Sequence, residues 1–127
     1  MNDRPTAAEL VDAVRHFLEA ELLPTLTDAR QRFQTLIAAN VLAIAGRELA
    51  TEADHLREEW SQLGGAALPV NLRAAVEECN RTLCARIRAG HYDDTDAFRS
   101  LAATLRKIVT RKLEVANPRF AFTRQEA

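Results

Sequence analysis

Apolar residues recur every three or four positions along most of this 127-residue sequence, and this spacing constrains the fold more than any other feature. A period of this length places apolar side chains on one face of an α-helix. Only 4 Gly and 4 Pro interrupt the pattern, and aromatic residues make up 6% of the chain, which is unlike a β-sandwich or barrel. Short connections between long amphipathic helices favour antiparallel neighbours. The sequence therefore predicts an all-α fold, an antiparallel bundle of four to five helices.

Local signals predict where the first helix begins and ends. Thr6-x-x-Glu9 has the pattern of a capping box, in which each of the two side chains accepts a hydrogen bond from the backbone N–H of the other residue. We expect this helix to end at Pro24, because the residue before a proline is pushed out of the helical region.

The segment from Asp28 to Leu63 has two interpretations. Its first part carries an apolar face made of Phe33, Leu36, Ile37, Val41 and Ile44. Past Gly46 the apolar positions, such as Leu56 and Trp60, move to a different face. We expect the helix to break between Gly46 and Thr51; the alternative is one long helix that shows different sides to different neighbours.

Two further helices complete the predicted bundle. Gly64-Gly65 stops the preceding helix, and Asn71 is the expected N-cap of a helix that ends at Gly90. Asp93 or Asp94 caps the last helix, and Asn117-Pro118 stops it. We expect residues 1–127 to form a single domain in which residues 118–127 are a C-terminal tail, with Phe120 and Phe122 folding back onto the bundle. The residues expected to be buried in the core include Phe33, Ile44, Leu83 and Leu105.

Charge is spread unevenly over the chain. The formal net charge is −1, but residues 1–63 hold 6 basic and 11 acidic side chains, whereas residues 64–127 hold 11 basic and 7 acidic ones. Either the acidic half packs beside the basic half, or a basic surface meets an anionic partner. The last two helices carry a basic set made of Arg86, Arg88, Arg106, Lys107, Arg111 and Lys112. The small net charge and the apolar helix faces argue against a nucleic-acid-binding protein.

The sequence predicts a cytoplasmic protein. No apolar run approaches the 18 residues that mark a membrane-spanning helix, and the N-terminus lacks the pattern of a signal peptide. Cys79 and Cys84 are five positions apart, which places them about 140° apart around a helix, so they cannot form a disulfide with each other.

Four polar residues near apolar faces are candidates for binding. Asn40 falls in the middle of the apolar face of its helix, so it either bonds to a facing helix and fixes its register or lines an internal pocket. Arg47 either extends to water or meets an anionic group at the mouth of the bundle. Asn80 and Arg86 border the buried face of a later helix, and Asn80 is placed to pair with Asn40 across the core.

No sequence motif indicates catalysis. His16, His55 and His91 have no metal-ligand spacing, and the chain lacks a glycine-rich phosphate loop and a nucleophile elbow. We therefore predict no catalytic residue, no metal site and no cofactor. Whether the protein is an enzyme stays open, and an enzyme would have to use Arg47, Glu48 or Asn80.

Four stretches of the chain resemble a family of small all-helical bacterial proteins of unknown function. They are Arg4 to Glu19, Ala39-Asn40 with Arg47-Glu48-Leu49, Leu83 to Gly90, and Lys112 to Arg119. Genes of this family often lie beside those for aminoglycoside-phosphotransferase-like kinases and acyl-CoA dehydrogenases. The resemblance implies an accessory role in the breakdown of hydroxyacyl or fatty acyl-CoA compounds, with the kinase or the dehydrogenase as a partner.

The leading hypothesis is thus a non-catalytic protein that binds a phosphotransferase-like kinase. The alternative is a bundle that binds a small molecule or an acyl-CoA, with Asn40 and Arg47 orienting its polar head. A homodimer is also possible, because an apolar face around Leu56 and Trp60 remains for a second copy.

Overall fold

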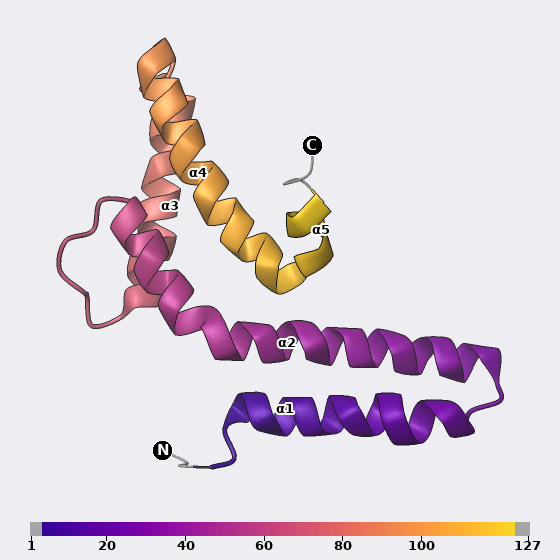
Figure 1. Ribbon diagram of the computed structural model, residues 1–127. Helices are drawn as coiled ribbons and strands as arrows, with labels where there is room; N and C mark the ends of the chain where they lie inside the picture. Colours follow the sequence, from indigo (N-terminus) through magenta and orange to yellow (C-terminus); the bar gives the residue numbers. More distant parts are fainter. Residues whose placement is uncertain (1–3, 124–127) are drawn as a thin grey trace. The chain divides into compact units, whose positions relative to one another are not determined.

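The computed structural model describes residues 4–123, except for the side chains of residues 121–123, and it contains no strand among the described residues. Its α-helices are α1 (Ala7–His16), α2 (Ala29–Gln62), α3 (Leu72–Arg88), α4 (Thr95–Ala116) and α5 (Pro118–Thr123) (Figure 1). A π-helical segment, η1 (Phe17–Leu22), and a 3-10 turn, η2 (Leu23–Thr25), continue the path of α1. The prediction of an all-α bundle of four to five helices is confirmed.

The chain divides into two compact units, Met1–Glu52 and Ala53–Ala127. The boundary lies inside α2, so this helix contributes its first part to one unit and its last part to the other. That the whole chain acts as one domain stays a prediction.

The capping box at the start of α1 is confirmed. The backbone N–H of Thr6 donates to Oε2 of Glu9 at 2.7 Å, and the N–H of Glu9 donates to Oγ1 of Thr6 at 3.2 Å. The helical path ends at Thr25, one residue past the predicted end at Pro24. The predicted reason is wrong, because Leu23 keeps helical angles (φ −54°, ψ −40°) and Pro24 lies inside η2. Proline fits there because the first positions of a helical turn need no backbone N–H donor.

The predicted break in α2 is also wrong, since one continuous helix runs from Ala29 to Gln62. Its first turn is capped by Asp28, whose Oδ1 accepts from the N–H of Gln31 at 2.8 Å. Gly46 packs against α1: a Cβ added there would lie 3.7 Å from Cγ1 of Val11. The last part of α2 instead contacts α3 and α4, as Glu59 shows below. The apolar positions rotate along α2 because its two parts have different neighbours, which was the alternative interpretation.

The first unit is a helical hairpin in which α1 and the first part of α2 run antiparallel (Figure 1). Ala39 is its buried apolar residue, 2% exposed. Phe33, predicted to lie in the core, is 64% exposed, and Leu10, Val14, Phe17, Leu36, Ile37 and Val41 are each about half exposed. The reason is geometric: in a pair of helices each helix is covered on one side only.

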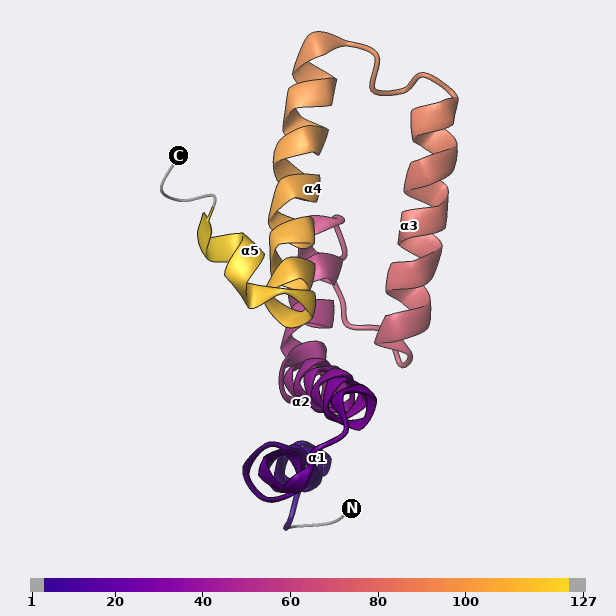
Figure 2. The same ribbon diagram turned by 90° about the vertical axis from the view of Figure 1, so that its right-hand side faces the viewer.

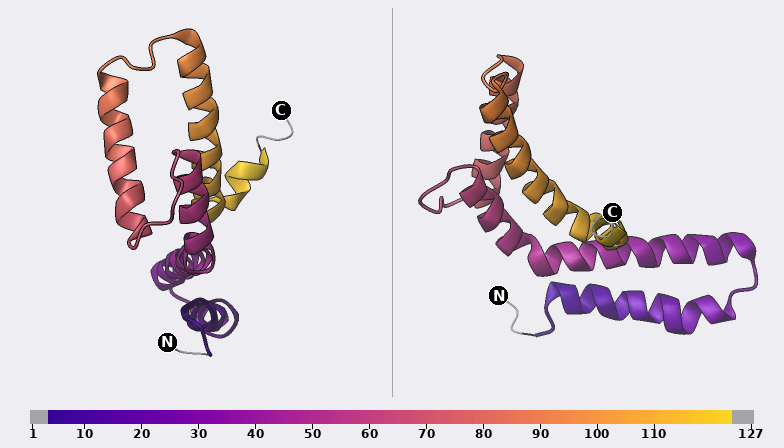
Figure 3. Two further views of the ribbon diagram at one scale, coloured as in Figure 1. Left: turned by 90° about the vertical axis from the view of Figure 1, so that its left-hand side faces the viewer. Right: turned by 45° about the horizontal axis from the view of Figure 1, so that its top comes forward.

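In the second unit, α3 and α4 run antiparallel (Figure 2 and the left view of Figure 3), and the last part of α2 contacts both of them through Glu59. Val76 of α3 and Ile108 of α4 are buried, at 4% and 6% exposure. Of the predicted core residues, Leu83 and Leu105 are half-buried, as is Ile44 in the first unit.

The caps of α3 and α4 agree with the sequence prediction. Asn71 caps α3 by accepting from the N–H of Ala74, and Asp94 caps α4 by accepting from the N–H groups of Asp96 and Ala97. At the end of α3, Gly90 has φ +81°, and the N–H of His91 donates to the carbonyl of Arg86 at 3.1 Å. The N–H of Gly90 donates to the carbonyl of Ile87, which completes a Schellman motif.

The loop after α2 closes over Trp60. Gly64 has φ +90°, and Gly65 lies so close to the indole ring that a Cβ there would overlap it. The indole Nε1–H donates to the carbonyl of Ala67 at 3.1 Å. Trp60 is thus half-buried within its own unit, and the pairing of this face with a second copy stays a prediction.

The C-terminal segment begins as predicted, because α4 ends at Ala116 and Pro118 starts the short helix α5. Phe120 is 48% exposed, and the side chain of Phe122 lies outside the described residues, as do residues 124–127. Within the part of the chain that the structure describes, none of the helices has the length and apolar character needed to cross a membrane.

Two glycine substitutions test this description of α2 and its loop. Gly46→Ala should raise the free energy of unfolding by about 0.5–1 kcal/mol, because the site is inside a continuous helix with room for a methyl group. Gly65→Ala should lower it by about 1–3 kcal/mol, because the methyl group displaces Trp60. Urea unfolding of both variants measures these changes; destabilisation by Gly46→Ala would contradict the continuous helix.

Candidate functional site

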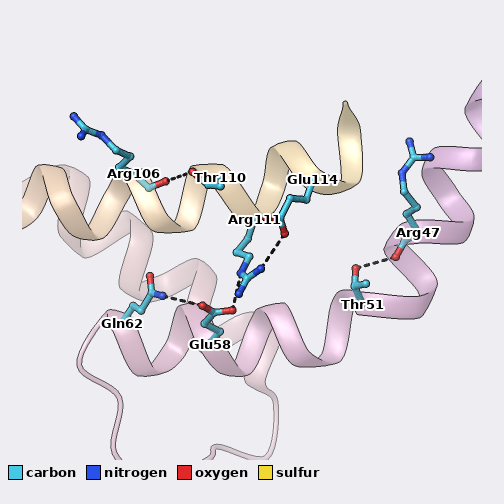
Figure 4. A network of polar contacts seen from close by, with 8 residues as sticks. All are labelled: Arg47, Thr51, Glu58, Gln62, Arg106, Thr110, Arg111 and Glu114. Atoms are coloured by element: carbon cyan, nitrogen blue, oxygen red, sulfur yellow. Dashed lines mark hydrogen bonds and ion pairs between the residues drawn. The ribbon is translucent and has the colours of Figure 1, made fainter. Parts of the chain in front are cut away.

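Two of the four candidate residues, Asn40 and Arg47, lie on α2 in the hairpin. Asn40 is exposed, so the prediction that it is buried is wrong. Ile37, its neighbour on the helix surface three positions earlier, is 49% exposed, so Asn40 lies beside exposed apolar surface. Arg47 is half-buried, and its backbone carbonyl accepts from the hydroxyl of Thr51 at 2.8 Å (Figure 4). Their roles in binding stay predictions.

The third candidate, Asn80, belongs to a polar junction in the second unit. Its Nδ2 donates to Oε1 of Glu59 at 2.9 Å, so the hydrogen bond of this amide goes to Glu59, not to Asn40. The same oxygen of Glu59 pairs with Nζ of Lys112 at 3.0 Å. Glu59 is 7% exposed and is the buried charged residue of the described chain. One carboxylate therefore connects α2 to both α3 and α4.

A second set of contacts surrounds Glu58, the residue before Glu59 (Figure 4). Nε of Arg111 contacts Oε2 of Glu58 at 3.1 Å, and NH1 of Arg111 contacts Glu114 at the same distance. The hydrogen bond from Arg111 to Glu114, together with the charges of Glu114 and Glu58, raises the pKa of the Arg111 side chain above its ordinary value. Nε2 of Gln62 donates to Glu58 at 3.2 Å, while Oε1 of Gln62 is buried and has no hydrogen-bond partner.

The ion pairs of Arg111 and Lys112 join basic residues of the second half of the sequence to acidic residues of the first half. Glu58 and Glu59 belong to the acidic half of the sequence, and their cationic partners belong to the basic half. For these residues, the interpretation in which the two halves pack together is confirmed. The cavity beside them has a volume of about 30 Å³, enough for a molecule of the size of water. The junction is therefore suited to holding helices together and has no space for an organic substrate.

The fourth candidate, Arg86, lies at one end of a larger groove along α3, here called the α3 groove. The groove has a volume of about 460 Å³ and lies between the end of α2, α3 and the loop after α3. Trp60 and Leu63 form one wall, and Arg86 and Tyr92 stand at one end. The Arg86 guanidinium lies 5.5 Å from the centroid of the Tyr92 ring, within the range of a cation–π interaction. The remaining lining residues, all from α3, are Ala75, Glu78, Cys79, Thr82 and Leu83.

Sequence reasoning missed Glu59 and most of the α3 groove. Glu59 lies three residues after Leu56 and four before Leu63, so it falls beside the apolar face of its helix. An acidic residue at such a position indicates that a buried partner of opposite charge lies nearby. The sequence alone could therefore have predicted a buried ion pair at Glu59. Cys79 and Cys84 are both free, as predicted. Within residues 4–123, no group of three or more His, Cys, Asp or Glu side chains is arranged to hold a metal ion.

Comparison with known proteins gives one finding. The model of a family described as a domain of unknown function, DUF6285, matches residues 24–120. The match starts at Pro24 and ends at Phe120, so it includes α2, α3 and α4, the polar junction and the α3 groove. No curated protein and no solved structure matches the chain.

Asn80→Ala tests the polar junction. Removing the amide leaves a buried carboxylate with one partner fewer, so the free energy of unfolding should fall by about 1–3 kcal/mol. Glu77→Ala, an exposed change on the same helix, is the control and should alter the free energy by less than about 0.5 kcal/mol. Equal effects of the two variants in urea unfolding would contradict the role of Asn80.

Proposed function

We propose that this chain, which belongs to the DUF6285 family of unknown function, is a non-catalytic accessory protein that binds a phosphotransferase-like kinase. The kinase would act in the breakdown of hydroxyacyl or fatty acyl-CoA compounds in a bacterium. The observation that supports binding to a protein is the exposed apolar surface of the hairpin. The choice of partner rests on the resemblance of the sequence to proteins encoded beside such kinases.

The exposed surface follows one side of α2. Phe33, Leu36, Ile37 and Val41, here called the hairpin strip, are 64%, 49%, 49% and 56% exposed. Their spacing of three, four and eight positions from Phe33 keeps them on one broad face of the helix. Contiguous apolar surface of this kind marks an interaction site in a soluble protein.

The hairpin strip is large enough to contribute to binding. Burying an exposed Val, Leu, Ile or Phe side chain contributes about 1.5–3 kcal/mol, so covering each half-exposed residue contributes roughly 1 kcal/mol. Four such residues contribute roughly 4 kcal/mol before the costs of association are subtracted. The exposed Asn40, beside the strip, offers an amide for a directional hydrogen bond to the partner.

The contacts of the buried Glu59 carboxylate support a non-catalytic role. Glu59 accepts from both Asn80 and Lys112, and these contacts hold it at the meeting point of three helices. A general base needs a carboxylate that can reach a substrate. The cavity next to Glu59, about 30 Å³, leaves no room for one.

Copurification tests the proposal. The tagged full chain should retain a phosphotransferase-like kinase at physiological salt. Ile37→Glu and Val41→Glu should each reduce retention at least about tenfold, because a charge in an apolar interface loses its hydration without gaining a partner.

Gln31→Glu is the matched control, because it adds the same charge at an exposed α2 position about 80° around the helix from Val41, the nearest residue of the hairpin strip. This variant should retain the kinase as the unchanged chain does. Failure of the unchanged chain to retain the kinase would remove the proposal, and retention of an acyl-CoA dehydrogenase in its place would replace the kinase as the partner.

A further inference from the structure

We propose that the α3 groove binds a small amphipathic anion, a molecule with one carboxylate or phosphate group and an apolar body. This inference is independent of the proposed function, because the two sites lie in different units. The residues of the groove belong to Ala53–Ala127, whereas the hairpin strip belongs to Met1–Glu52. It rests on the size of the groove, its apolar lining, and the charge at one end.

The groove has the size and lining of a site for a small ligand. Its volume of about 460 Å³ falls within the range of roughly 300–1,000 Å³ that is usual for such sites. Ala75, Cys79, Leu83 and Arg86 follow one another at intervals of four, four and three positions, so α3 presents them on one face. The indole of Trp60 forms the opposite wall. An apolar body lying along α3 would thus contact apolar atoms on both sides.

The charge at the end of the groove favours an anion. Among the described residues, no carboxylate forms an ion pair with Arg86. The acidic residue of the groove, Glu78, is already paired with Arg81 at 2.9 Å. The groove therefore presents one guanidinium without a counter-charge. Stacking on Tyr92 occupies the face of this guanidinium and leaves N–H groups at its edge for a carboxylate or phosphate.

Hydrogen bonds to backbone carbonyls fix the Trp60 wall and the Arg86 end of the groove. Gly65 and the carbonyl of Ala67 hold the Trp60 ring, and the Schellman motif after α3 ties His91 to Arg86. A site that is formed before the ligand arrives loses less conformational entropy on binding. Tyr92, one residue after His91, is held over the guanidinium by the same turn.

Trp60 makes the test direct, because it is the single tryptophan of the chain and it lines the groove. The full chain is titrated with octanoate, and with octanol as an uncharged molecule of the same chain length. We expect a saturable change in tryptophan emission with octanoate, and binding of octanol at least about tenfold weaker. Arg86→Gln should weaken octanoate binding to the level of octanol.

Arg88→Gln is the control, because it removes the same charge from the same helix and Arg88 does not line the groove. It should change octanoate binding by less than about twofold. Thr82→Phe, a change at an exposed residue of the lining, fills the groove and should abolish the emission change while circular dichroism shows that the helices remain.

Three results would overturn the inference: no saturable emission change with octanoate, equal weakening by Arg86→Gln and Arg88→Gln, or undiminished binding to Thr82→Phe. None of these depends on whether a kinase is retained by the hairpin. Failure of the groove and failure of the proposed function are therefore distinguishable.

Discussion

The carboxylate of Glu59 is the contact on which the second unit depends. Taking a charge out of water costs several kcal/mol, and only close partners offset this cost. Asn80 supplies one of these partners from α3 and Lys112 supplies the other from α4. Because Trp60 is the next residue, the contact that fixes the rotation of α2 also fixes the wall of the α3 groove. The register of the helices and the shape of the groove thus share one cause.

The hairpin formed by α1 and the first part of α2 has no comparable anchor. Its buried apolar residue is the small Ala39, and its large apolar side chains are about half exposed or more. Two packed helices cover only a part of each other's surface, so a hairpin gains less from burial than a bundle does. Covering the hairpin strip with a partner would supply the missing burial, and for this reason we assign the two units different tasks: binding a protein and binding a small molecule.

Local signals in the sequence predicted the ends of most helices. The capping box at Thr6 and Glu9, the N-caps Asn71 and Asp94, and Gly90 act within a few residues, so their geometry can be read from neighbouring positions. What covers a helix face cannot be read in this way. Asn40 and Phe33 lie on an apolar face as predicted, yet no helix of the hairpin covers them. The polar junction was missed because its contacts join residues 21 and 53 positions apart.

A double-mutant cycle between Glu59 and Lys112 tests the central claim most directly. The free energy of unfolding is measured in urea for the unchanged chain, Glu59→Gln, Lys112→Met and the double variant. If the carboxylate holds α4 in place through Lys112, the two changes should couple by about 1 kcal/mol or more. A sum that is additive within about 0.3 kcal/mol would show that the two side chains do not support each other, and would contradict the account.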